Sequence, residues 1–191
     1  MKKKYGQYIK RKIKSDFKKE FPEFQFQNQK HSCYQFVKKI GKGWNVIKVC
    51  HEENDCFSIG LMWSPKEEEE EIQNVVLVYL ELMRPYNINQ LINYELKKVS
   101  ITLADFWADD FDSRWAVDQS GKILECIKQN GYITSDAYYE FFSHGIDRFD
   151  EPELPEEQYS IYIDPLIDNA VEMIKKYALP LFEAFEKKEK A

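Results

Sequence analysis

The densest group of residues that could do chemistry is an acidic cluster formed by Asp105, Asp109, Asp110 and Asp112. Carboxylates this close together could bind a divalent cation or act as a general acid/base pair. The spacing lacks the glycine and the glutamate of an EF-hand loop, and a solvated loop is the favoured explanation. We keep the four aspartates as candidate metal ligands, and with them an enzyme or metal binder as one alternative function.

Histidine and cysteine form no recognisable catalytic or metal site. The three histidines are far apart, and no two of the four cysteines have C-x-x-C spacing. Cys50 and Cys56 could bridge a hairpin, but free thiols are the favoured interpretation. Cys126 and His144 could form a nucleophile and base pair. The place of Cys126 on an apolar helical face favours a core position instead. Nucleophile-elbow and phosphate-loop motifs are also missing, so we assign no catalytic residue and no cofactor.

Positive charge is concentrated near the N-terminus. Residues 1–50 contain 14 Lys/Arg and 3 Asp/Glu, a net charge of +11, whereas residues 51–191 contain 13 and 30, a net charge of −17; together they give −6. The basic segment could contact phosphates, with Trp44 and Tyr34 as stacking surfaces, although the acidic remainder would repel a polyanion. The favoured interpretation is a helix whose basic face pairs with acidic residues of the same chain or of another subunit. The candidate partner-binding residues are Lys10, Arg11, Lys14, Lys18 and Trp44.

These charges need an element that positions them, and residues 3–20 have the pattern of an amphipathic helix. Apolar residues recur every four positions from Tyr5 to Phe21, while lysine and arginine fill the other faces. Phe21 precedes a proline, which disfavours helical backbone and ends the helix.

The next forty residues alternate with a period of two, which predicts strands. Four short apolar-polar segments, near residues 24–27, 34–40, 44–50 and 57–64, are separated by polar turns. This pattern is typical of an antiparallel meander. Residues 73–82 are β-branched and apolar on both faces, which suggests a further, central strand, with a helix as the alternative. Residues 89–98 suit a short helix, and residues 99–104 suit either a strand or a helix.

The last third has helical patterns and cap signals. We predict a helix over residues 115–129 with Gly131 as its C-cap, and a helix from Ser135 to about residue 142 with Ser135 as its N-cap. Asp164 before Pro165 predicts a third helix with the aspartate as N-cap. Pro180 is expected to break or kink that helix before a last amphipathic turn or two.

Together these elements predict an α+β fold, with an N-terminal helix, an antiparallel β-meander and C-terminal helices packed on one face of the sheet. We expect a single domain over residues 1–191, with the basic helix at 3–20, a β-rich part at 24–104 and a mainly helical part at 112–188. Hydrophobic residues make up 43% of the chain and aromatics 15%, which is enough for a core and argues against disorder.

No apolar run approaches the roughly 20 residues that cross a bilayer. The lysine-rich start is not followed by the apolar stretch of a secretory signal. We therefore expect a cytoplasmic protein without a membrane span.

The chain resembles a family of small bacterial domains of unknown function, in which a helix is followed by an aromatic meander and a closing helix. The matching pieces are Phe24-Gln25-Phe26, Tyr34-Gln35-Phe36-Val37-Lys38, residues 57–64 and Tyr177-Ala178-Leu179-Pro180-Leu181-Phe182. The resemblance implies an α+β fold and assigns no catalytic residue. Proteins of this kind often look like immunity or interaction partners.

We therefore expect a non-enzymatic protein-interaction module, one form of which is an immunity-type protein that binds a basic partner through an acidic surface. The first alternative is a nucleic-acid-binding protein that uses the basic N-terminal helix. The second is an enzyme or metal binder that uses the aspartates at 105–112.

Overall fold

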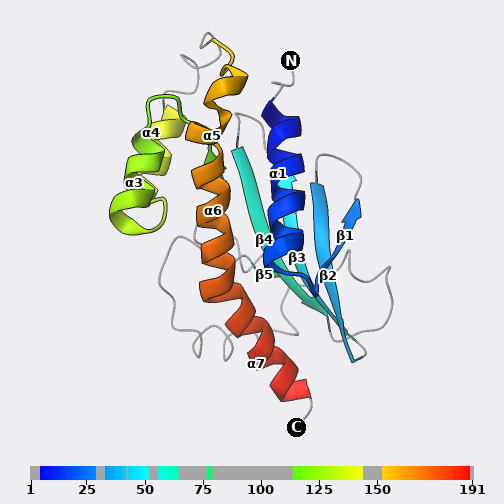
Figure 1. Cartoon of the computed structure of the whole chain (residues 1–191). Helices are drawn as coiled ribbons and strands as arrows, with labels where there is room; N and C mark the ends of the chain where they lie inside the picture. Colours follow the sequence, from blue (N-terminus) through cyan, green and yellow to red (C-terminus); the bar gives the residue numbers. More distant parts are fainter. Residues whose placement is uncertain are drawn as a thin grey trace.

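The structure is a computed structural model that describes residues 5–28, 33–41, 43–51, 56–64, 77–78, 114–143 and 152–189. An antiparallel sheet forms one layer, and helix α1 (Tyr5–Glu20) lies over it beside the C-terminal helices (Figure 1). The fold class predicted from the sequence, α+β with the helices on one face, is confirmed.

Helix α1 follows the predicted four-residue spacing. Tyr5, Ile9, Ile13 and Phe17 are its buried residues, and they form one stripe because 3.6 residues make a turn. The helix ends at Glu20, and the N–H of Phe21 donates to the carbonyl of Phe17 at 2.8 Å. Burial of this stripe leaves the charged residues of α1 on the other sides of the helix.

The predicted meander is confirmed. Strands β1 (Gln25–Asn28), β2 (Cys33–Ile40), β3 (Gly43–His51) and β4 (Cys56–Ser64) pair antiparallel in chain order. Gly41, with φ +53°, takes the left-handed conformation that the tight turn between β2 and β3 requires. The short strands β5 (Leu77–Val78) and β6 (Arg114–Ala116) both pair with β4, along different stretches of it.

Strand alternation gives the sheet two faces. Tyr34 and Phe36 of β2 and Ile47 of β3 lie on the face that α1 covers, and the Phe17 and Phe36 rings have centroids 4.9 Å apart. The core therefore sits between the sheet and the helices.

The C-terminal segment contains two short helices and then a nearly continuous helical column. The short helices are α3 (Lys122–Asn130) and α4 (Ser135–Ser143). The column consists of η4 (Glu156–Gln158), α5 (Tyr159–Tyr162), α6 (Asp164–Met173), η5 (Ile174–Ala178) and α7 (Leu179–Glu189). The predicted disturbance at Pro180 takes the form of a π-helical turn, η5, directly before α7.

The helix predicted over residues 115–129 begins too early. Trp115 belongs to β6 and stacks on Phe57 of β4, with ring centroids 5.4 Å apart. Asp118 accepts hydrogen bonds from the N–H groups of Ser120 and Ile123, and α3 starts only after this turn. The predicted C-cap is confirmed, since the glycine that follows α3 has φ +80° and donates its N–H to Ile127.

The expectation of free thiols is wrong for two of the four cysteines. Cys33 and Cys50 lie directly opposite each other in the register of β2 and β3, with Cα atoms 4.2 Å apart, and form a disulfide. Cys56, the other residue of the bridge considered from sequence, is buried and forms no disulfide, as is the case for Cys126. The only bridge considered from the sequence joined Cys50 to Cys56, six positions apart, whereas the strand register joins residues 17 positions apart.

The expected central strand is described only at residues 77–78, on the outer side of β4. The remainder of residues 73–82, the helix expected at 89–98 and the segment at 99–104 lie outside the described residues.

Candidate interaction surface

A line of charged contacts joins α1 to α6. The Lys12 Nζ lies 2.5 Å from Asp16 Oδ2 and 4.0 Å from Asp164 Oδ2. Burial opposes the charge of Lys12, but the hydrogen bond to Asp16 and the charges of Asp16 and Asp164 outweigh it and raise the pKa of Lys12. Pairing of the basic helix with acidic residues of the same chain is thus observed at this position.

Tyr8 makes a further polar contact between α1 and α6. Its hydroxyl donates to Asp164 Oδ1 at 2.7 Å, and its ring lies 5.0 Å from that of Tyr159. Desolvation, followed by the hydrogen bond to Asp164, raises the pKa of Tyr8 to about 12. The N-cap role predicted for Asp164 is wrong, because the N-cap position of α6 is Ile163 and the Asp164 carboxylate is used by α1.

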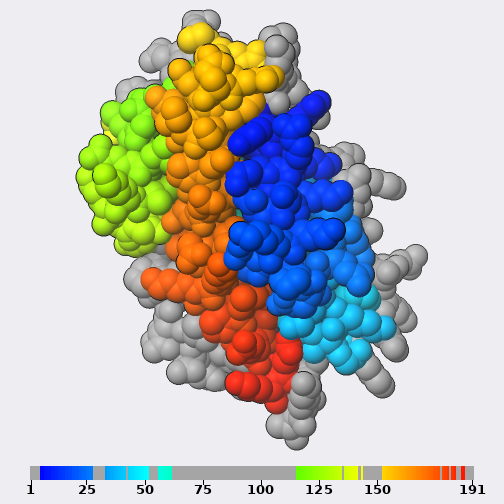
Figure 2. All heavy atoms as spheres, in the orientation of Figure 1, coloured from blue at the N-terminus to red at the C-terminus, as the bar shows by residue number. Residues whose placement is uncertain are grey.

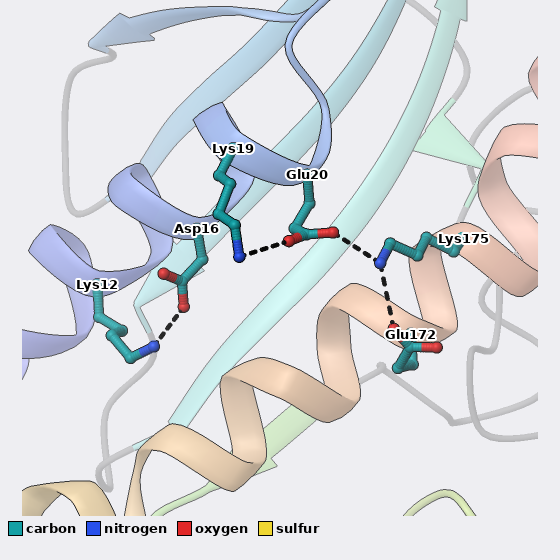
Figure 3. A network of polar contacts seen from close by, with 6 residues as sticks. All are labelled: Lys12, Asp16, Lys19, Glu20, Glu172 and Lys175. Atoms are coloured by element: carbon teal, nitrogen blue, oxygen red, sulfur yellow. Dashed lines mark hydrogen bonds and ion pairs between the residues drawn. The ribbon is translucent and has the colours of Figure 1, made fainter.

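A second network of ion pairs, drawn in Figure 3, lies at the C-terminal end of α1. Lys175 Nζ lies 2.7 Å from Glu20 Oε2 and 3.3 Å from Glu172 Oε1, and Lys19 contacts the same Glu20 carboxylate at 3.3 Å. The hydrogen bonds from Lys175 and Lys19 lower the pKa of Glu20. Ion pairs therefore join α1 to α6 near Lys12 and to η5 near Glu20.

The other cations of α1 lie toward the sheet or toward solvent. Lys10 Nζ is 5.4 Å from the centre of the Tyr34 ring, and Lys14 Nζ is 4.3 Å from that of Phe26, within the range of cation–π attraction. Arg11, Lys14 and Lys18 are exposed and follow one another at spacings of three and four residues. We call these three residues the basic stripe, since that spacing places them on one outward face of α1.

Trp44, the fifth candidate, is not part of this surface. Trp44 of β3 is paired with Lys39 of β2, and the Lys39 Nζ lies 5.6 Å from the centre of the Trp44 ring. Alternation along the strands places both residues on the sheet face opposite to α1. Tyr34 is on the correct face but only 1% exposed, beneath α1. The structure therefore places the four basic candidates on one helix, α1: Lys10, Arg11, Lys14 and Lys18. Of the two predicted stacking surfaces, Trp44 lies on the other face of the sheet and Tyr34 is buried.

A second charged surface, which the sequence analysis did not identify, runs along the helical column. Residues 152–172 contain six Asp/Glu and no Lys/Arg. Glu157, Asp168 and Glu172 are exposed. With Ile161 they form the series 157, 161, 168 and 172, whose spacings of four, seven and four residues place all four on one face of the column. We call Glu157, Asp168 and Glu172 the acidic stripe. The spacing is readable in the sequence, but Glu157 and Ile161 precede the helix that the sequence predicts from Asp164.

Ile161 gives the acidic stripe an apolar centre of contact. It is 58% exposed, and only one other large hydrophobic residue among those described, Tyr139, is similarly accessible. Protein interfaces place apolar contacts inside a rim of polar groups, and Ile161 with the carboxylates on either side of it has this arrangement on a small scale. Figure 2 shows the helical column and α1 side by side on one face of the molecule.

The described residues contain no group of three or more His, Cys, Asp or Glu side chains that could hold a metal ion. The candidate ligands Asp105, Asp109, Asp110 and Asp112 lie outside the described residues, as does His144. The metal-binding alternative therefore rests on the sequence alone. Among the described helices, none has the length and apolar character that a membrane span requires.

The comparisons with known proteins found no match to a family model, to a curated protein or to a solved structure. This outcome fits the resemblance to a family of unknown function.

Proposed function

We propose that this protein is a non-enzymatic interaction module that binds a basic protein through its acidic stripe. An immunity-type protein that neutralises a basic toxin nuclease is the form that suits this charge. The observation that supports the proposal best is the exposed row of Glu157, Asp168 and Glu172 around the exposed Ile161.

Charge and burial support a protein partner at this position. The acidic stripe presents carboxylates on a helical column whose opposite side is buried against the sheet, so its backbone geometry is held by the core. Complementary charge would accelerate encounter with a basic partner. Ile161 would supply the apolar contact that exposed ion pairs, each worth about 0.2–1 kcal/mol, do not provide.

The same surface argues against the nucleic-acid alternative. A polyanion that approached the basic stripe would also meet Asp168 and Glu172 on the neighbouring helix, and like charges repel. Lys12 is already paired with Asp16 and Asp164. The aromatic stacking that single-stranded nucleic acids use is not offered beside the basic stripe by the described part of the chain, since Tyr34 is buried.

The proposal is tested by comparative capture from the cells that make this protein. We would immobilise the wild-type chain, the variant E157K/D168K/E172K and the control variant E125K/E183K, which reverses one exposed carboxylate on α3 and one on α7, outside the acidic stripe. A basic protein retained by the wild-type and control chains and lost by the stripe variant is the expected result. It would then be purified and its binding measured directly. Retention that is equal on all three chains, or no retained protein, would contradict the proposal.

We also propose that the protein acts in the cytoplasm. The absence of a long apolar helix among the described residues is compatible with this location. In a reducing cytoplasm the Cys33–Cys50 pair, which is joined by a disulfide in the structure, would be kept as two thiols. The proposal predicts that alkylation during cell lysis, under denaturing conditions, modifies four cysteines. Modification of only two would indicate an oxidising compartment and refute this location.

A further inference from the structure

The acidic and basic stripes lie on neighbouring helices that run in the same direction. Tyr8 of α1 contacts Tyr159, Lys12 contacts Asp164, and Glu20 contacts Lys175, so residue numbers rise together along both helices. Figures 1 and 2 show α1 and α6 side by side on one face of the molecule. Because Arg11, Lys14 and Lys18 are exposed on α1 and Asp168 and Glu172 are exposed on α6, this face carries a positive row and a negative row that run parallel.

A surface with two parallel rows of opposite charge is self-complementary under one particular symmetry. If two copies meet face to face around a two-fold axis parallel to the helices, α1 of each copy lies over α6 of the other. A two-fold axis perpendicular to the helices would instead place α1 over α1 and α6 over α6, with like charges opposed. The charge pattern thus selects one of the two arrangements.

The heights of the charged residues agree with this arrangement. Between the Lys12–Asp164 contact and the Glu20–Lys175 contact, Lys14 lies near the level of Asp168 and Lys18 near the level of Glu172. A two-fold axis parallel to the helices preserves these levels. Both pairs of residues are four positions apart, which is about 6 Å along a helix, so both contacts can form at once.

We propose that the partner for this face is a second copy of the chain, which forms a symmetric dimer by docking the basic stripe of each copy on Asp168 and Glu172 of the other. The inference uses part of the acidic stripe but does not depend on the proposed function. Where a basic partner exists, the two would compete for the same carboxylates.

The size of the face indicates a weak and reversible dimer. The 16 residues of α1 make a helix about 24 Å long, and two helices about 10 Å wide present about 480 Å² per copy. A standard stable interface buries about 800 Å² per partner. Association should therefore depend strongly on salt, because the screening length falls from about 10 Å at 0.1 M to about 3 Å at 1 M.

Charge exchange between the stripes provides the test. Variant K14E/K18E makes the basic stripe acidic, and variant D168K/E172K makes the acidic stripe basic; all four side chains are exposed. The matched controls K128E/K187E and E125K/E183K make the same changes of charge at exposed positions elsewhere. Circular dichroism would verify that all chains are folded. Sedimentation at 0.1 M and 1 M salt would then measure the mass of each chain against the 22.9 kDa of a monomer.

We expect the wild-type chain and both controls to show a dimer at 0.1 M salt that dissociates at 1 M salt. Each stripe variant should be monomeric alone, and an equal mixture of the two should recover the dimer, because both interhelical contacts are then between opposite charges again. A wild-type chain that stays monomeric up to millimolar concentration, or a mixture that fails to recover the dimer, would overturn the inference. The proposed function would survive that result, because a basic partner should still bind K14E/K18E.

Discussion

The hydrogen bond between Tyr8 and Asp164 should stabilise the packing of α1 against α6, and its removal should lower the free energy of unfolding by a measurable amount. The hydroxyl of Tyr8 donates to a charged carboxylate at 2.7 Å, and hydrogen bonds to charged groups contribute about 1.5–3 kcal/mol. The Asp164 side chain is 25% exposed, so we expect the lower value, about 1.5 kcal/mol, for Tyr8→Phe. In a chain of this size that corresponds to a fall in Tm of about 3–6 °C.

The assay is a double-mutant cycle in urea with Tyr8→Phe, Asp164→Ala and the double variant, followed by circular dichroism. The expected coupling energy is about 1 kcal/mol, since contacting residues are not additive. The exposed Tyr139 provides the control, where Tyr→Phe should change stability by less than about 0.5 kcal/mol. Additive effects of the two substitutions, within error, would refute this stabilising contact.

The pH dependence provides a second readout of the same contact. The pKa of Tyr8 is raised from 10.0 to about 12 in the folded chain, so its contribution is complete below pH 10 and is lost as the pH rises from 10 to 12. Asp164→Ala should lower the pKa of Tyr8 toward 10. The pKa would be measured by NMR from the pH dependence of the Tyr8 ring carbon resonance, which is assigned by its absence in Tyr8→Phe. An unchanged pKa in Asp164→Ala would mean that Asp164 does not hold the hydroxyl proton.

Three further predictions concern the core, the second ion-pair network and the disulfide. Phe17→Ala should cost about 3–5 kcal/mol in urea unfolding, because the ring is fully buried; a cost below about 1 kcal/mol would contradict the packing described. Lys175 and Lys19 lower the pKa of Glu20, so Glu20→Gln should reduce stability near pH 7 and have no effect at a pH below the lowered pKa; an equal effect at both pH values would argue against the pair. In purified chain that has been oxidised, reduction of the Cys33–Cys50 disulfide, which closes a loop of 17 residues, should lower the free energy of unfolding by about 3 kcal/mol, and an unchanged Tm after reduction would be inconsistent with the bond.

The parts of the fold that were predicted correctly are those in which one local pattern decides the element. The four-residue spacing from Tyr5 to Phe17 defines α1, and alternation defines β2 to β4. Trp115 was misassigned because its stacking on Phe57 is a long-range contact that overrides a helical pattern. The Cys33–Cys50 pair was missed because strand register, and not sequence spacing, decides which cysteines meet.

The candidate surface was predicted only in part, for a related reason. Composition located the positive charge on one helix, and Lys14 and Lys18 are indeed exposed there. No local pattern could show that Asp164 would accept a hydrogen bond from a residue 156 positions earlier. Trp44 was grouped with the basic residues as a possible stacking surface for bases, whereas alternation along β3 places it on the other face of the sheet.

The most direct test of the proposed function is a calorimetric titration of the captured basic partner into the wild-type chain, E157K/D168K/E172K and the control E125K/E183K. We predict that the stripe variant binds at least about tenfold more weakly than the wild-type chain, a difference of about 1.4 kcal/mol, while the control binds as the wild-type does. Raising the salt from 0.1 M to 1 M should weaken wild-type binding as well, because exposed charges are screened. Equal affinity of the wild-type chain and the stripe variant would contradict the claim that this acidic surface binds the partner.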